Sequence, residues 1–78
     1  MDEQIRDLIR QGVEALKAGD KATARRILLD VTNRAPAYQD AWLWLSDTTN
    51  SPVEQRGYIE QAISIDPYSR AGQIAQKS

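Results

Sequence analysis

The side chains that most often perform enzyme chemistry are scarce in this sequence. It contains no histidine and no cysteine, so the usual general bases, thiol nucleophiles and zinc ligands are absent. The closest group of acidic residues is Asp2, Glu3 and Asp7. These carboxylates fall on the polar face of an expected first helix, where negative charge complements the positive end of the helix dipole. We therefore predict that the chain is not an enzyme and that it holds no metal or cofactor.

The basic residues offer a second kind of chemistry, the binding of nucleic acid. Lys21, Arg25 and Arg26 form a basic cluster, and Arg34 lies on the same segment. However, 10 basic and 11 acidic residues give a formal net charge of -1, whereas binding to phosphate backbones usually requires a basic excess. A solvated helix face is the simpler interpretation of the cluster. We predict no nucleic-acid partner, and a small helical DNA-binding domain using these four residues stands as the alternative.

The composition indicates one small globular domain. A chain of 78 residues forms a core that is only marginally stabilising. With 41% hydrophobic and 27% charged residues, it is typical of a folded rather than a disordered protein. The start, Met1 to Gln4, is acidic, and no uninterrupted apolar run follows it, so we expect neither a signal peptide nor a membrane-spanning helix. The default expectation is a cytoplasmic protein with no membrane partner.

Apolar residues recur every three or four positions along the chain, which is typical of amphipathic helices. The expected helices cover residues 2–18, 21–34, 39–49, 52–65 and 69–77. Their apolar stripes comprise Ile5, Leu8, Ile9, Gly12, Val13 and Leu16 in the first, Ala24, Ile27, Leu28 and Val31 in the second, Trp42, Leu45 and Thr49 in the third, Val53, Ile59, Ala62 and Ile63 in the fourth, and Ala71, Ile74 and Ala75 in the last. The pattern predicts five helices and no strand.

Turn-forming residues separate these helices. Gly19 and Asp20 predict a tight turn, because glycine tolerates the left-handed conformation that ends a helix and aspartate caps the next one. So short a link requires the first two helices to pack antiparallel. Pro36 ends the second helix, and Ser51-Pro52-Val53-Glu54 matches a capping box with proline at the first helical position. Gly12 lies inside the first helix, where we expect a close approach by another backbone.

The stretch from Pro36 to Ser46 contains both tryptophans. On a helix, Trp42, Leu45 and Thr49 lie on one stripe, whereas Leu43 and Trp44 lie off it. One apolar face is therefore not enough for this helix. We expect it to contact neighbours on more than one side, with Trp42 in the core and Trp44 outside it.

Two helical pairs each end in a proline and carry similar residues before it. The matching positions are Leu8, Gly12, Ala24, Leu28 and Pro36 in the first pair, and Trp42, Leu45, Ile59, Ala62 and Pro67 in the second. Through these positions the chain resembles the tetratricopeptide repeat family. The resemblance implies a single all-α domain over residues 1–78, with a first helical pair at 2–36, a second at 37–67 and a capping helix at 68–78, stacked as a short superhelix.

The spacing of the two prolines departs from the family pattern. Pro36 and Pro67 are 67 − 36 = 31 residues apart, three fewer than the roughly 34 residues of the family's repeat. The matches place this deficit between Thr49 and Gln55. We expect a shortened first helix or turn in the second pair.

The resemblance also implies a function, because the first helices of such pairs line a concave groove that binds a peptide or a partner helix. The residues expected to contact the partner are Ile9, Val13 and Leu16 from the first pair and Leu43, Trp44 and Asp47 from the second, with Ala71, Ile74 and Ala75 at the corresponding places of the last helix. We predict a protein-protein interaction or scaffolding module with an apolar groove. Two alternatives leave this surface covered: the last helix folds over it, or two chains pair through it as a weak homodimer or self-associating bundle.

Overall fold

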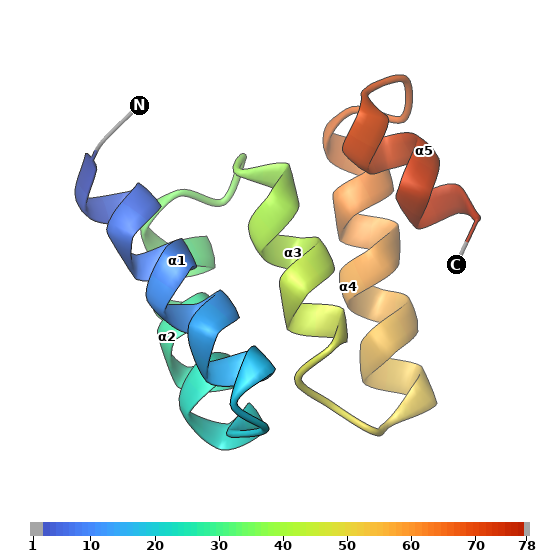
Figure 1. Ribbon diagram of the computed structural model, residues 1–78. Helices are drawn as coiled ribbons and strands as arrows, with labels where there is room; N and C mark the ends of the chain where they lie inside the picture. The colour runs from blue at the N-terminus through green and yellow to red at the C-terminus, as the bar shows by residue number, and fades with distance from the viewer. Residues whose placement is uncertain (1–2, 78) are drawn as a thin grey trace.

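The computed structural model describes residues 3–77, and within this range the chain is all-helical, without strands (Figure 1). The helices are α1 (Glu3–Lys17), α2 (Lys21–Arg34), α3 (Gln39–Ser46), α4 (Pro52–Ile65) and α5 (Arg70–Gln76). The predicted all-α class and the five helices are confirmed. Asp2, which we expected in the first helix, lies outside the described residues.

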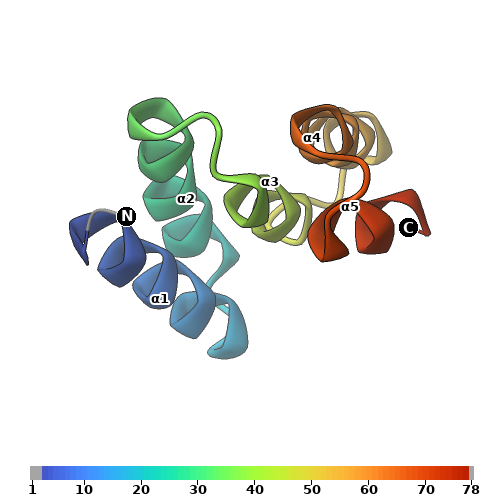
Figure 2. The ribbon, with the colours of Figure 1, turned by 90° about the horizontal axis from the view of Figure 1, so that it is seen from above.

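The helices form two layers. Each helix runs antiparallel to the one before it and packs against it, and α5 also contacts α3 (Figure 1). Viewed from above, α1, α3 and α5 lie on one side of the molecule and α2 and α4 on the other (Figure 2). The chain therefore presents one face that is built from alternate helices, and the α2 and α4 layer supports that face from behind.

The turn between α1 and α2 has the predicted chemistry. Gly19 has a φ of 83°, a conformation that glycine adopts without a steric penalty. The carboxylate of Asp20 accepts a hydrogen bond from the backbone N–H of Thr23 at 3.1 Å, which caps α2. Gly12 is buried as expected, but a side chain rather than a backbone approaches it, since a Cβ at Gly12 would lie 2.9 Å from Cγ of Leu28. The absence of a side chain at Gly12 thus lets α1 approach α2.

The core lies between the two layers and consists of small and aliphatic side chains. Ala24, Leu28, Val31, Ala41, Leu45, Ala62 and Ala75 are each at most 1% exposed. One prediction for the core is wrong, because Val53 is 82% exposed. Val53 lies nine residues before Ala62, which is two and a half helical turns at about 3.6 residues per turn, so the two side chains point to opposite sides of α4. The inward face of α4 follows Ala62.

The end of α3 also differs from the prediction. The helix stops at Ser46 rather than Thr49. Side-chain hydroxyls bond the last carbonyl groups: Ser46 Oγ donates to Leu43 O at 2.6 Å and Thr48 Oγ1 donates to Leu45 O at 2.7 Å. Serine and threonine compete in this way with continued helical bonding. The early stop makes α3 eight residues long, against 15 for α1.

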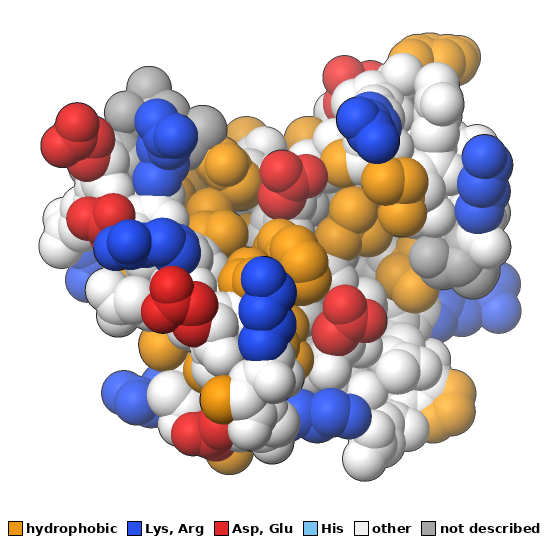
Figure 3. All heavy atoms as spheres, in the orientation of Figure 1, with side chains coloured by type: hydrophobic (Ala, Val, Ile, Leu, Met, Phe, Trp, Pro, Cys, Tyr) orange, Lys and Arg blue, Asp and Glu red, His pale blue; other side chains and the backbone are white. Residues whose placement is uncertain are grey.

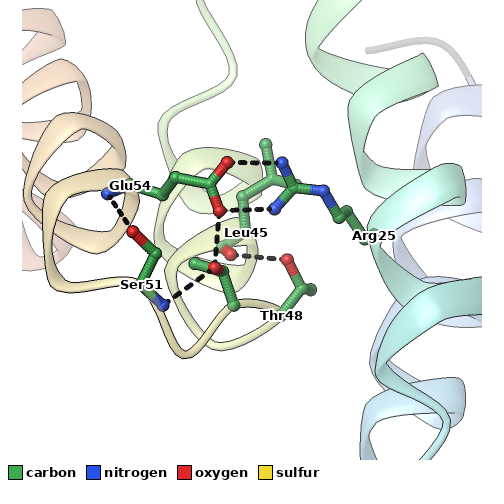
Figure 4. Close-up of polar contacts among 6 residues, drawn as sticks. Arg25, Leu45, Thr48, Ser51 and Glu54 are labelled. Atoms are coloured by element: carbon green, nitrogen blue, oxygen red, sulfur yellow. Dashed lines mark hydrogen bonds and ion pairs between the residues drawn. The ribbon is translucent and has the colours of Figure 1, made fainter.

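A polar network joins the first helical pair to the start of α4 (Figure 4). The carboxylate of Glu54 accepts hydrogen bonds from the hydroxyl of Thr49 at 2.6 Å and from the guanidinium of Arg25 at 3.0 Å. Ser51 completes the predicted cap, because its hydroxyl accepts a bond from the N–H of Glu54 at 3.3 Å. The carboxylate of Glu54 does not return a bond to Ser51 as in a simple capping box. Instead the N–H of Ser51 donates to Thr49 Oγ1 at 3.1 Å.

We expect this network to make stability depend on pH. The hydrogen bonds from Thr49 and then Arg25 hold the pKa of Glu54 below its ordinary value of 4.5. A carboxyl group whose pKa is lower in the folded state stabilises the fold above its ordinary pKa and loses that contribution as the pH falls through the folded-state pKa. Glu54→Gln should therefore lower the thermal midpoint at pH 7, and the difference from the parent chain should shrink towards pH 3.

The matched control for this prediction is Glu60→Gln. Glu60 pairs with Arg56 at 3.0 Å, but both side chains are largely exposed, and exposed pairs contribute little to stability. The midpoint of this variant should follow the parent chain at every pH. A constant deficit of Glu54→Gln from pH 7 to pH 3 would show that the carboxylate charge of Glu54 is not what the network uses.

Candidate binding groove

A groove lies between α3 and α5 on the face built from alternate helices. It has a volume of about 520 Å³ and is lined by Asp40, Leu43, Trp44, Ser46, Asp47, Arg70, Ala71 and Ile74. The space-filling view of this face shows hydrophobic side chains gathered in its recessed middle, with acidic and basic side chains around them (Figure 3). An apolar floor with a few charged groups at its rim is the usual composition of a binding site.

The two tryptophans of α3 point to different sides of that helix. They are two residues apart, which is a little more than half a turn. Trp44 lines the groove and is half-buried. Trp42 packs towards α4, where its ring centroid lies 6.2 Å from that of Tyr58, and its indole N–H donates to Pro36 O at 2.8 Å. Trp42 is half-buried rather than enclosed in the core as expected.

Only part of the predicted contact set lines this groove. Leu43, Trp44 and Asp47 come together there, with Ala71 and Ile74 from α5. The three predicted residues of α1 do not line it, although Ile9, Val13 and Leu16 are all half-buried. Ile9 instead packs against the core cluster of Ile5, Val31 and Ala41. The groove is therefore formed by α3 and α5.

The last helix departs from the prediction at one position. Ala75 is 1% exposed and does not line the groove, whereas Ile74 does and is 53% exposed. Adjacent residues of a helix are about 100° apart, so the two side chains cannot share the groove when α5 also packs on α4. The apolar stripe of α5 is thus divided between the core and the groove.

Gln39, at the start of α3, positions α5 beside it. Its side-chain amide donates to Ala62 O at 2.6 Å and to Asp66 O at 2.8 Å, which satisfies carbonyl groups at the end of α4. Its amide oxygen accepts a hydrogen bond from the hydroxyl of Ser69, the N-cap of α5. One glutamine therefore connects three helices at one end of the groove. Sequence reasoning did not identify this role, since glutamine spacing carries no signal for a contact more than 20 residues away.

The charged residues of the groove lie outside the ion pairs found in residues 3–77. Ion pairs in residues 3–77 join Asp7 to Arg10, Arg25 to Glu54, Asp30 to Arg34, and Arg56 to Glu60. The carboxylates of Asp40 and Asp47 and the guanidinium of Arg70 take part in none of these pairs, and all three residues are exposed. Asp40 and Arg70 were missed by the sequence prediction. The available signal for Asp40 was its position seven residues before Asp47, on the same side of a helix.

Comparison with known proteins gives no assignment, since no protein-family model, curated protein or solved structure matches the chain. In the described part of the chain, no helix combines the length and apolar character needed to cross a membrane. No group of three acidic side chains there is placed to hold a metal ion. The groove is therefore the feature of the molecule from which a function can be inferred.

Proposed function

We propose that this protein is a tetratricopeptide-like interaction module whose groove between α3 and α5 binds a helical segment of a partner protein. The observation that carries the proposal is the half-buried indole of Trp44, with Leu43 beside it, on the floor of an open groove. Tryptophan is enriched among the residues that dominate binding energy at protein interfaces. A partner that covers this ring would remove apolar surface from water.

The shape of the groove supports a helical ligand. Its walls come from two helices, α3 and α5, that contact each other, and a third helix can lie along such a pair with its apolar residues between them. The last helix contributes a wall to the groove without closing it, because Ile74, which lines the groove, remains 53% exposed. These features favour an intermolecular ligand over internal cover by α5.

The contacts of the basic residues favour this function over DNA binding. Arg25 pairs with Glu54 at 3.0 Å and its guanidinium lies 5.8 Å from the ring centroid of Tyr58. Arg34 pairs with Asp30, and the ammonium of Lys21 donates to Asn50 at 3.2 Å. Three of the four basic residues that would bind DNA therefore already contact other side chains of the protein. A phosphate backbone would have to compete with these contacts.

The test is a titration of the protein with an amphipathic helical peptide whose apolar residues recur every three or four positions. The backbone amide shifts of the protein report where the peptide binds. We expect the shifts to cluster at residues 40–47 and 70–74. Trp44→Ala should weaken binding by about tenfold or more, as truncation of a central anchor does. Leu29→Ala is the control, because Leu29 is an exposed apolar residue on α2, outside the groove.

Two results would contradict the proposed function. One is an equal effect of Trp44→Ala and Leu29→Ala on affinity. The other is a set of amide shifts that maps to α1 and α2 instead. Sedimentation of the free protein at rising concentration tests the self-association alternative, because a dimer would increase the apparent mass. A dimer formed through this face would also shift the amides of the groove residues in the absence of peptide.

A further inference from the structure

The groove contains two acidic side chains that have no cationic partner within residues 3–77. Asp40 lies in the first turn of α3 and Asp47 directly follows its last residue. They are 47 − 40 = 7 residues apart, about 10 Å at 1.5 Å per residue, and both line the groove with Leu43 and Trp44. Carboxylates therefore lie at each end of the apolar floor on α3. With Arg70 as the only cation among the lining residues, the lining carries a net negative charge.

The two carboxylates are not equivalent. Asp40 lies near the positive end of the α3 dipole, which favours a negative charge, and Arg70 lines the same groove. Asp47 lies at the negative end, where the dipole disfavours it. A cation from a partner would be attracted both by the carboxylate of Asp47 and by the end of the helix. The groove is therefore most selective for positive charge beside Asp47.

On this basis, and resting on the proposed function, we infer that the partner segment is a basic amphipathic helix that places a lysine or arginine against Asp47. Its apolar stripe covers Trp44 and Leu43, and a second basic residue about two turns away lies near Asp40. Charge complementarity of this kind determines which partner binds more than it raises the total affinity. Asp47 is thus the residue that selects the partner.

The same charges disfavour a second copy of the chain as the occupant. Groove-to-groove pairing around a two-fold axis would bring two linings of the same sign together. Like charges that face each other across an interface oppose association. In a homodimer through this face, the four carboxylates of the two linings would share only the two Arg70 guanidinium groups.

The experiment compares two peptides that have the same apolar residues and differ at two flanking positions seven residues apart. One peptide carries lysine at both positions and the other carries glutamate. At low salt we expect the lysine peptide to bind about tenfold more tightly, and the difference should shrink as salt is added. Asp47→Lys should reverse the preference. Asp47 is exposed and a cation suits the end of a helix, so this variant should keep the thermal midpoint of the parent chain.

The outcomes separate the two proposals. Equal affinity of the two peptides, with amide shifts in the groove that Trp44→Ala abolishes, would leave the proposed function intact and overturn the charge preference. A preference for the lysine peptide that survives in Asp47→Lys but disappears in Asp40→Asn would overturn the role of Asp47. If neither peptide shifts the groove residues, both the proposed function and this inference are wrong.

Discussion

Trp42→Ala is expected to lower the free energy of unfolding by about 3 kcal/mol, close to the lower limit for truncating a buried tryptophan. The indole packs against the ring of Tyr58, so its removal leaves a gap between α3 and α4. It also removes the donor that bonds Pro36 O at 2.8 Å. We place the loss near the lower limit because the indole is half-buried. In a domain of this size, such a loss is a large fraction of the total stability.

The comparison that tests this prediction is between the two tryptophans of the same helix. Trp44→Ala should cost about 1 kcal/mol, because its half-buried ring lines the groove between α3 and α5. Trp42→Phe keeps an aromatic ring against Tyr58 and loses the hydrogen bond, so its cost should be intermediate. Denaturant unfolding of the three variants gives the ranking. Equal losses for Trp42→Ala and Trp44→Ala would contradict the division of α3 into a packed side and a groove side.

The bounds of a helix were predictable where capping residues and prolines lie at its ends. The bounds of α2 and α4 agree with the prediction, because Asp20 and Ser51 cap the following helices and prolines lie near their ends. The end of α3 was not predictable from periodicity. There, the hydroxyls of Ser46 and Thr48 bond to carbonyl groups that would otherwise accept the next helical hydrogen bonds. A periodic stripe shows where a helix could continue and not where side chains stop it.

The groove was predictable on α3 and not on α1. The spacing of Leu43, Trp44 and Asp47 places them on one side of a helix whatever lies around it. In contrast, the role of Ile9 depends on which neighbour its side of α1 meets, and it meets the core cluster that contains Val31 and Ala41. Helical spacing assigns residues to a common face, but the packing of α1 on α2 and α3 decides whether that face is free.

The long-range polar contacts could not be predicted at all. Arg25 and Glu54 are 29 residues apart, and Gln39 bonds to groups more than 20 residues away. Each contact depends on the angle and distance between helices, which the residue pattern of a single helix does not contain. Both contacts nevertheless hold the second pair and α5 in place. The sequence therefore indicates the helices and five of the eight residues that line the groove, and the polar contacts between helices determine how the groove is assembled.

Gly72→Ala is expected to displace α5 and to damage the groove through that displacement. Gly72 is buried in the first turn of α5, and its N–H donates to Ser69 Oγ at 2.9 Å. A Cβ at this position would lie 3.0 Å from the carbonyl carbons of Asp66 and Pro67 and closer still to Asp66 O. Those atoms belong to the backbone of the tight connection between α4 and α5, so they cannot move aside as a flexible side chain could. We expect a loss of about 2 kcal/mol from overpacking.

Gly57→Ala is the matched control, because Gly57 lies inside α4 with no atom near its would-be Cβ. This substitution should raise stability by about 0.5–1 kcal/mol, as alanine does in an exposed helix interior. Thermal unfolding, hydrogen exchange at the amides of α5 and titration with the amphipathic peptide measure the three consequences. Gly72→Ala should lose stability, protection of α5 and peptide affinity, since Ala71 and Ile74 form one wall of the groove. Unchanged protection of α5 and unchanged affinity in Gly72→Ala would show that the groove does not depend on the close passage of the chain at Gly72.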